Sequence, residues 1–122
     1  MFKKIGVGIT TAVLIFLYQS KVYSTTYSLI PGQSMVVSNT LTHSISGYCL
    51  ISAYPDAVNS ILITMQNGTG LFNGTSLSPG QTLNQNVYNT QYIPFTASAR
   101  ASALIKNTNG KNSYAIQAEC YS

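Results

Sequence analysis

The sequence predicts an all-β protein: a small antiparallel β-sandwich of the Ig-like or Greek-key type, with about seven to eight strands and one disulfide, after a signal peptide. Short apolar runs alternate with polar residues and are separated by Gly, Pro and Asn turn signals. After the first 24 residues, no stretch combines a sustained helical apolar stripe with helix caps. Two cysteines in an exported chain can supply a covalent staple for a small core.

The first 24 residues are typical of a secretory signal peptide. Lys3 and Lys4 precede an uncharged run at 5–20, and Val22 and Ser24 suit cleavage after Ser24. A membrane anchor would need about 20 apolar residues to cross the hydrocarbon, and this run is shorter and contains Gly and Thr. We therefore expect a single domain over residues 25–122, with no membrane insertion after cleavage.

The first three strands are expected at residues 25–30, 33–39 and 43–53. Pro31-Gly32 suits the central positions of a type II turn between the first two. In the third, apolar residues and Cys49 alternate with mostly small polar residues, the pattern of a half-buried antiparallel strand. Tyr54-Pro55-Asp56 ends this strand, because Pro lacks the N–H group and Asp favours turns.

The middle of the chain is expected to form one strand and a tight hairpin. The β-branched run 60–65 is followed by Asn67-Gly68. A second pair, Asn73-Gly74, separates 70–72 from 75–77 and predicts a type I′ hairpin, because both central residues of that turn need positive φ. Both Asn-Gly-Thr triplets also fit the glycosylation sequon, but we interpret them as turns, which demand the same residues.

The remaining strands are expected at 81–88, 91–96, 99–106 and 113–121. We place 91–96 at a sheet edge, because Pro94 cannot donate to a hydrogen-bond ladder. In the last strand, Cys120 shares a face with Ile116 and Ala118, as Cys49 shares one with apolar residues in its own strand.

The segment LIPGQS at 29–34 recurs almost unchanged as LSPGQT at 77–82. A duplicated half-domain is one interpretation, but nothing else in the chain repeats at this spacing. Pro, Gly and Gln at these positions suit turns that lead into strands. We therefore interpret the repeat as a structural turn used twice.

Cys49 and Cys120 are expected to form a disulfide, since export supplies an oxidising compartment and the cysteine count is even. The enclosed loop of about 70 residues corresponds to roughly 4 kcal/mol in the chain-entropy model. The sequence leaves open whether the bond bridges two sheets or joins neighbouring strands.

The charge of the domain is close to neutral once the signal peptide is removed. The domain then has a net charge of +1, from three cationic residues, Arg100, Lys106 and Lys111, and two anionic residues, Asp56 and Glu119. A phosphate-binding surface needs several clustered cations, because each neutralised phosphate contributes separately to affinity. We expect no nucleic-acid partner.

Few residues could carry catalysis. A Ser-His-Asp triad would have to use His43 and Asp56, and no G-x-S-x-G motif selects a serine. The only carboxylates available for glycoside cleavage are Asp56 and Glu119, expected in a turn and on an outer strand face. Zinc needs three or four ligands, and the cysteines are expected to bind each other. We expect no enzyme activity, no metal and no cofactor.

The domain offers seven tyrosines and no tryptophan among many Asn, Gln, Ser and Thr residues. Exposed tyrosine suits adaptable recognition of sugars or proteins, because it combines apolar area with a hydroxyl at little entropy cost. Tyrosine is also simply a good strand former. The candidate ligand-binding residues are Tyr48, Tyr54, Tyr88, Tyr92 and Tyr121.

Several turn and strand motifs carry a resemblance: Leu-x-Pro-Gly-Gln-Ser, Ser-Gly-Tyr-Cys, Phe-Asn-Gly-Thr-Ser-Leu-Ser-Pro-Gly-Gln-Thr and a terminal Glu-Cys-Tyr-Ser. With the signal peptide, they make the chain resemble small exported single-disulfide β proteins of Gram-negative intracellular bacteria. The resemblance implies an exported β domain and assigns a role to no residue.

The leading functional hypothesis is an exported, secreted or periplasmic, non-enzymatic module that recognises a protein or glycan partner through neutral loops and tyrosines. The first alternative is a structural or accessory subunit of a cell-envelope assembly, in which an edge strand pairs with a neighbour. The second is a small secreted hydrolase that depends on His43.

Overall fold

The computed structural model describes residues 24–110 and 114–122, and every regular element in them is a β-strand. The predicted signal peptide lies outside the described residues, except for Ser24, which begins the first strand. Within these two ranges, no helix is long and apolar enough to cross a membrane.

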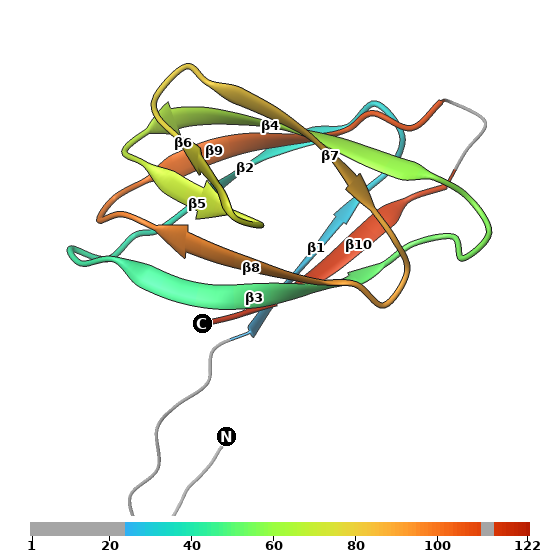
Figure 1. Cartoon of the computed structure of the whole chain (residues 1–122), viewed down its shortest axis with the longest axis horizontal. Coiled ribbons are helices and arrows are strands. Elements are labelled where there is room, and N and C mark those ends of the chain that lie inside the picture. Colours follow the sequence, from blue (N-terminus) through green and yellow to red (C-terminus); the bar gives the residue numbers. More distant parts are fainter. Residues whose placement is uncertain (1–23, 111–113) are drawn as a thin grey trace, which may run out of the picture.

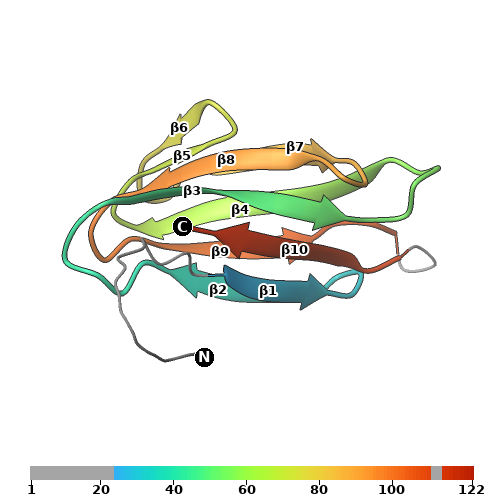
Figure 2. The same ribbon diagram turned by 90° about the horizontal axis from the view of Figure 1, so that it is seen from below.

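Two antiparallel sheets pack face to face (Figures 1 and 2). Sheet A has the order β1 (Ser24–Leu29), β10 (Ile116–Tyr121), β3 (Ile45–Ser52), β8 (Tyr92–Ala97), β5 (Gly70–Phe72) and β6 (Thr75–Leu77). Sheet B has the order β2 (Ser34–Ser38), β9 (Ser102–Asn107), β4 (Asn59–Asn67) and β7 (Thr82–Val87). The predicted all-β sandwich is confirmed.

The strand order is that of a jelly roll. Apart from the turn between β5 and β6, every connection crosses from one sheet to the other. Without that hairpin, the sheets read β1-β10-β3-β8 and β2-β9-β4-β7, the arrangement that two interlocked Greek keys produce. This order specifies the predicted Greek-key type and differs from the immunoglobulin arrangement. The β5–β6 hairpin extends sheet A beyond β8.

The repeated Pro-Gly-Gln segments are structural turns, as predicted. Gln33 donates its backbone N–H to the Ile30 carbonyl and accepts the Ile30 N–H on its side-chain oxygen, at 3.0 and 2.9 Å. The same pair of bonds closes 78–81 and also 88–91, which contains no Pro-Gly. The third residue of each turn has positive φ: 84° and 87° at the two glycines and 65° at Thr90.

The hairpin predicted around Asn73-Gly74 is confirmed. These two residues connect β5 to β6 with φ values of 48° and 87°, so both central positions have the positive φ of a type I′ turn.

The prediction that 91–96 forms an edge strand is wrong, because β8 lies between β3 and β5. Pro94 is tolerated there because β5 is short and pairs only with residues 95–97. The carbonyl of Pro94 faces this side and accepts the backbone N–H of Asn73, at 2.9 Å, where β5 has already ended. The missing N–H therefore falls beyond the ladder rather than inside it.

Two predicted strands begin later than expected. β9 starts at Ser102, because residues 98–101 form a turn in which Ala101 N–H donates to the Ser98 carbonyl and Arg100 has φ 59°. β10 starts at Ile116, and of the residues predicted ahead of it, 113 lies outside the described ranges.

The disulfide between Cys49 and Cys120 is present and joins directly paired residues of β3 and β10. It therefore links neighbouring strands within sheet A and does not bridge the two sheets. Both cysteines face the space between the sheets, as the alternation in their strands predicts.

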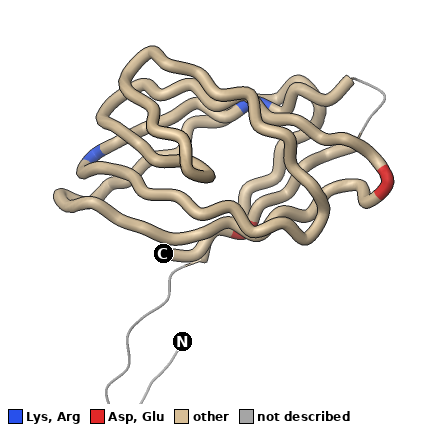
Figure 3. Tube along the Cα trace, in the orientation of Figure 1, with Lys and Arg blue, Asp and Glu red and all other residues tan. Residues whose placement is uncertain are grey.

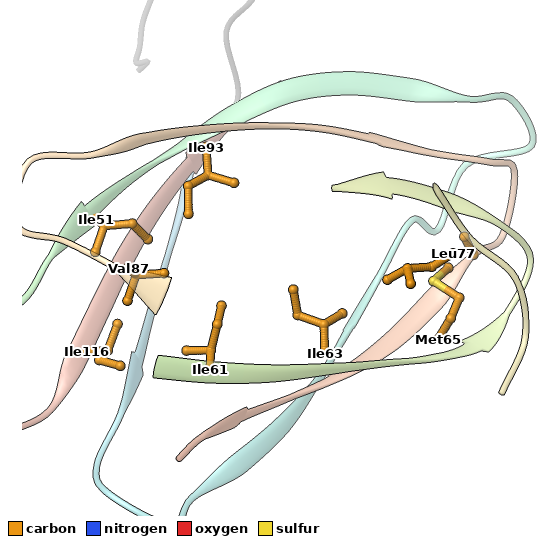
Figure 4. Close-up of a cluster of buried hydrophobic side chains, with 9 residues drawn as sticks. Ile51, Ile61, Ile63, Met65, Leu77, Val87, Ile93 and Ile116 are labelled. Atoms are coloured by element: carbon orange, nitrogen blue, oxygen red, sulfur yellow. The ribbon is translucent and has the colours of Figure 1, made fainter. Parts of the chain in front are cut away.

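Buried aliphatic side chains from both sheets form the core. Figure 4 shows Ile51, Val87, Ile93 and Ile116 gathered at one end, Met65 and Leu77 at the other, and Ile61 and Ile63 on β4 between them.

Candidate functional site

Three tyrosines form a row across the outer face of sheet A. Tyr121 on β10 stacks on Tyr48 on β3, with ring centroids 5.1 Å apart and an interplanar angle of 30°. Tyr92 on β8 meets Tyr48 edge to face, with centroids 5.4 Å apart. Tyr48 is 42% exposed and Tyr92 is 63% exposed. The row is thus a continuous aromatic surface open to solvent, which we call the tyrosine row.

The disulfide fixes the register of this row. Tyr48 and Tyr121 are directly opposite each other, one residue away from the directly opposite pair Cys49 and Cys120. Because successive side chains point to opposite faces, the sulfurs lie inside and the rings outside. A further constraint comes from Gly47, where a Cβ would overlap the carbonyl oxygen of Tyr121. The absence of a side chain at Gly47 lets the end of β10 approach β3.

A carboxylate lies beside the tyrosine row. Glu119 is two residues before Tyr121 on the same face of β10 and opposite Leu50 of β3. A hydrogen bond with Glu119, together with desolvation and the negative charges nearby, raises the pKa of the Tyr121 hydroxyl above its usual 10.0. The hydroxyl is therefore held as a neutral donor next to an acceptor.

A shallow hollow adjoins the row on the side of the hairpin. Its outward-facing lining includes Ser46, Leu71, Pro94 and Thr96. The Ser46 and Thr96 hydroxyls lie 3.0 Å apart and form a hydrogen bond. Next to the three rings, this hollow supplies hydroxyls that can both donate and accept.

The other two predicted tyrosines lie away from the row. Tyr54 follows β3 and stacks in parallel on Tyr114, with centroids 4.0 Å apart. The carbonyl of Tyr114 accepts side-chain N–H bonds from Asn107 and Asn109. Tyr88 occupies the turn before β8 and is 51% exposed. Of the five predicted residues, the fold brings together Tyr48, Tyr92 and Tyr121.

The residues considered for catalysis, His43 and Asp56, lie at opposite ends of β3. His43 precedes β3 and Asp56 follows it, so an eight-residue strand, about 26 Å long, separates them. Figure 3 shows the charged residues scattered singly over the trace. Among residues 24–110 and 114–122, no group of three His, Cys, Asp or Glu side chains is placed to hold a metal ion.

Sequence reasoning missed three contributors to these surfaces. Glu119 was interpreted only as a solvated outer residue, although its shared parity with Tyr121 could have indicated their proximity. The Ser46–Thr96 pair and the partner of Tyr54 depend on contacts between distant segments, for which the sequence contains no local signal.

The fold and this surface define a jelly-roll domain with an exposed aromatic row on one sheet. No protein-family model matches the chain, and neither does any curated protein.

Proposed function

We propose that this protein is an exported, non-enzymatic module that binds a neutral glycan on the outer face of sheet A. The observation that carries the proposal is the tyrosine row, in which Tyr92 and Tyr121 each contact the central Tyr48 on adjacent strands, with all three side chains at least partly exposed. Export is supported by the disulfide, which persists in oxidising compartments.

The row suits sugars because it offers two kinds of contact at once. Aromatic rings provide apolar area for the C–H faces of a sugar, and their hydroxyls provide hydrogen bonds at the edges. The bonded Ser46 and Thr96 hydroxyls and the Glu119 carboxylate add donors and acceptors beside the rings.

Charge favours a neutral glycan over an acidic one. Glu119 is the one carboxylate on this face of β10, and the described Lys and Arg residues, Arg100 and Lys106, lie in a turn and on sheet B. An anionic sugar would meet a like charge with no cation from these residues to offset it. Jelly rolls include lectin domains, but that likeness of fold alone assigns no function.

The test is a calorimetric titration of the mature protein with four series of neutral oligosaccharides. These are cello-, malto-, xylo- and N-acetylglucosamine oligomers. We expect saturable binding of at least one series. Tyr92→Ala should weaken it about fivefold or more, because a lost aromatic contact costs about 1 kcal/mol or more. Tyr48→Ala should weaken it further, since Tyr48 contacts both other rings.

Tyr88→Ala is the matched control, since the exposure of Tyr88, 51%, lies between those of Tyr48 and Tyr92, and Tyr88 is in a turn outside the row. It should leave oligosaccharide affinity unchanged. Absence of saturable binding by all four series would overturn the proposal. So would equal losses from Tyr88→Ala and Tyr92→Ala.

A further inference from the structure

A cavity of about 270 Å³ lies between the two sheets. Protein interiors are normally packed so closely that voids larger than a water molecule are rare. The middle of this sandwich is therefore left incompletely filled by its own side chains.

The lining of the cavity is apolar, and no charged residue contributes to it in the described part of the chain. Three of the lining residues are the small residues Ala97, Ala103 and Ala118, where a larger side chain would fill part of the space. The polar lining residues, such as Thr25, Ser38 and Ser102, are exposed or half-buried. Water inside would find few hydrogen-bond partners.

The cavity reaches solvent along the edge formed by β1 and β2. These strands end the two sheets on the same side (Figure 2) and do not pair with each other. Their inward-facing residues Tyr27, Met35 and Val37 line the cavity yet stay half-buried, whereas Ile51 and Ile63 in the middle are nearly inaccessible. Entry between β1 and β2 needs no ladder hydrogen bond to break.

We propose that this cavity is a second binding site, which takes one unbranched, uncharged alkyl or acyl chain. The ligand is uncharged along its buried length because the lining offers no counter-ion. It is a hydrocarbon because the lining is aliphatic and aromatic from both sheets.

The dimensions of the cavity indicate the length and shape of the alkyl or acyl ligand. The lining extends from β1 to β6, five inter-strand steps of sheet A, or about 24 Å. An apolar cavity of about 150 Å³ holds benzene, so 270 Å³ corresponds to on the order of ten carbon atoms. Because the cavity is elongated across the strands, this volume fits a linear chain and not a fused ring system.

Calorimetric titration with n-alcohols from hexanol to tetradecanol tests the proposal with defined probes. Affinity should rise about fourfold for each added methylene, the amount expected for burying one such group. The rise should stop near ten carbons, where the chain fills the cavity. Adsorption to an exposed surface would instead give increments that continue through tetradecanol, and that result would overturn the proposal, as would absence of saturable binding.

Filling the cavity is the complementary test. Ala103→Phe should lower decanol affinity at least tenfold, because the ring occupies the same volume. Ala118→Leu is a milder substitution in sheet A that should act in the same direction if Ala103→Phe does not fold. Ala99→Phe, in an exposed turn outside the lining, is the matched control and should bind decanol as the natural chain does.

The two proposed sites are separable in the same experiments. Tyr92→Ala should leave decanol affinity unchanged, and Ala118→Leu should leave oligosaccharide affinity unchanged. If decanol affinity is unchanged in both Ala103→Phe and Ala118→Leu, decanol binds outside the cavity, and this result contradicts the inference. Failure of the oligosaccharide titrations leaves the decanol result intact.

Discussion

The two faces of sheet A differ in chemistry although the same three strands supply both. On the outer face, β10, β3 and β8 present the tyrosine row beside a carboxylate. On the inner face, they present the disulfide, alanines and isoleucines around an apolar cavity. Side chains alternate along each strand, so one short backbone segment serves both surfaces. A substitution at one position should therefore affect one face, unless it disturbs the strands themselves.

Removal of the disulfide should have the largest effect and should damage both faces together. Cys49→Ser breaks the only covalent link between β3 and β10 in the described chain, one residue from Tyr48 and Tyr121. We expect a loss of about 2 to 5 kcal/mol in the free energy of unfolding. Thermal denaturation should record a fall of at least about 8 °C in Tm.

The double variant Cys49→Ser/Cys120→Ser distinguishes loss of the disulfide from the effect of leaving Cys120 unpaired. Its loss should match that of Cys49→Ser alone, because both changes remove the same interaction. An unchanged Tm in the single variant would contradict the structural role of the bond.

Gly47→Ala should have an intermediate effect, mainly on the outer face. Its Cβ would overlap the Tyr121 carbonyl oxygen, so the end of β10 must move away from β3. Overpacking of this kind costs about 1 to 3 kcal/mol, and displacement of Tyr121 should weaken oligosaccharide binding. Chemical denaturation and calorimetry measure the two effects.

Gly70→Ala is the matched control for this prediction. A Cβ there meets nothing closer than 3.4 Å, although the residue lines the cavity. We expect a change in stability within about 0.5 kcal/mol. Equal destabilisation by both variants would show that the contact with Tyr121 is not what requires glycine at 47.

The pH dependence of Tyr121 should give the smallest effect. Its pKa is raised, so the stability contributed by the protonated hydroxyl is present below pH 10.0 and is lost as pH rises through the raised folded pKa. Glu119→Gln should lower the Tyr121 pKa toward 10.0, because it removes the charged acceptor. An NMR titration of labelled tyrosine measures this shift.

Gln117→Ala, on the same face of β10, is the control and should leave that titration unchanged. If Glu119→Gln leaves the Tyr121 pKa where it was, Glu119 is not the cause of the shift.

Local patterns predicted most of the strands and several turns because those features depend on neighbouring residues. Asn73-Gly74 is one such case, and the alternation around Cys49 and Cys120 correctly placed both sulfurs inside. The position of Pro94 was predicted wrongly, since its tolerance depends on where the distant β5 ends.

The two proposed binding sites depend on contacts between strands that are distant in the sequence. The alternation of side chains along each strand placed Tyr48 and Tyr121 on outer faces. Their contact, however, follows from the pairing of β3 with β10, whose cysteines are 71 residues apart in the sequence. The cavity left no sequence signal, because alternation reports which residues face inward and not how much volume they fill. Ala103 and Ala118 count as apolar in the pattern whether or not a void adjoins them.

The position of the disulfide also determines how the domain would respond to mechanical force. Tension applied at residues 24 and 122 cannot extend the chain between Cys49 and Cys120, so β4 to β9 are shielded from the pull. Among the strands, β1, β2, the first half of β3 and the last residue of β10 lie outside this loop and can be drawn out. These include both strands at the mouth of the cavity. Stretching should therefore open the cavity between the sheets, while the disulfide next to Tyr48 and Tyr121 remains intact.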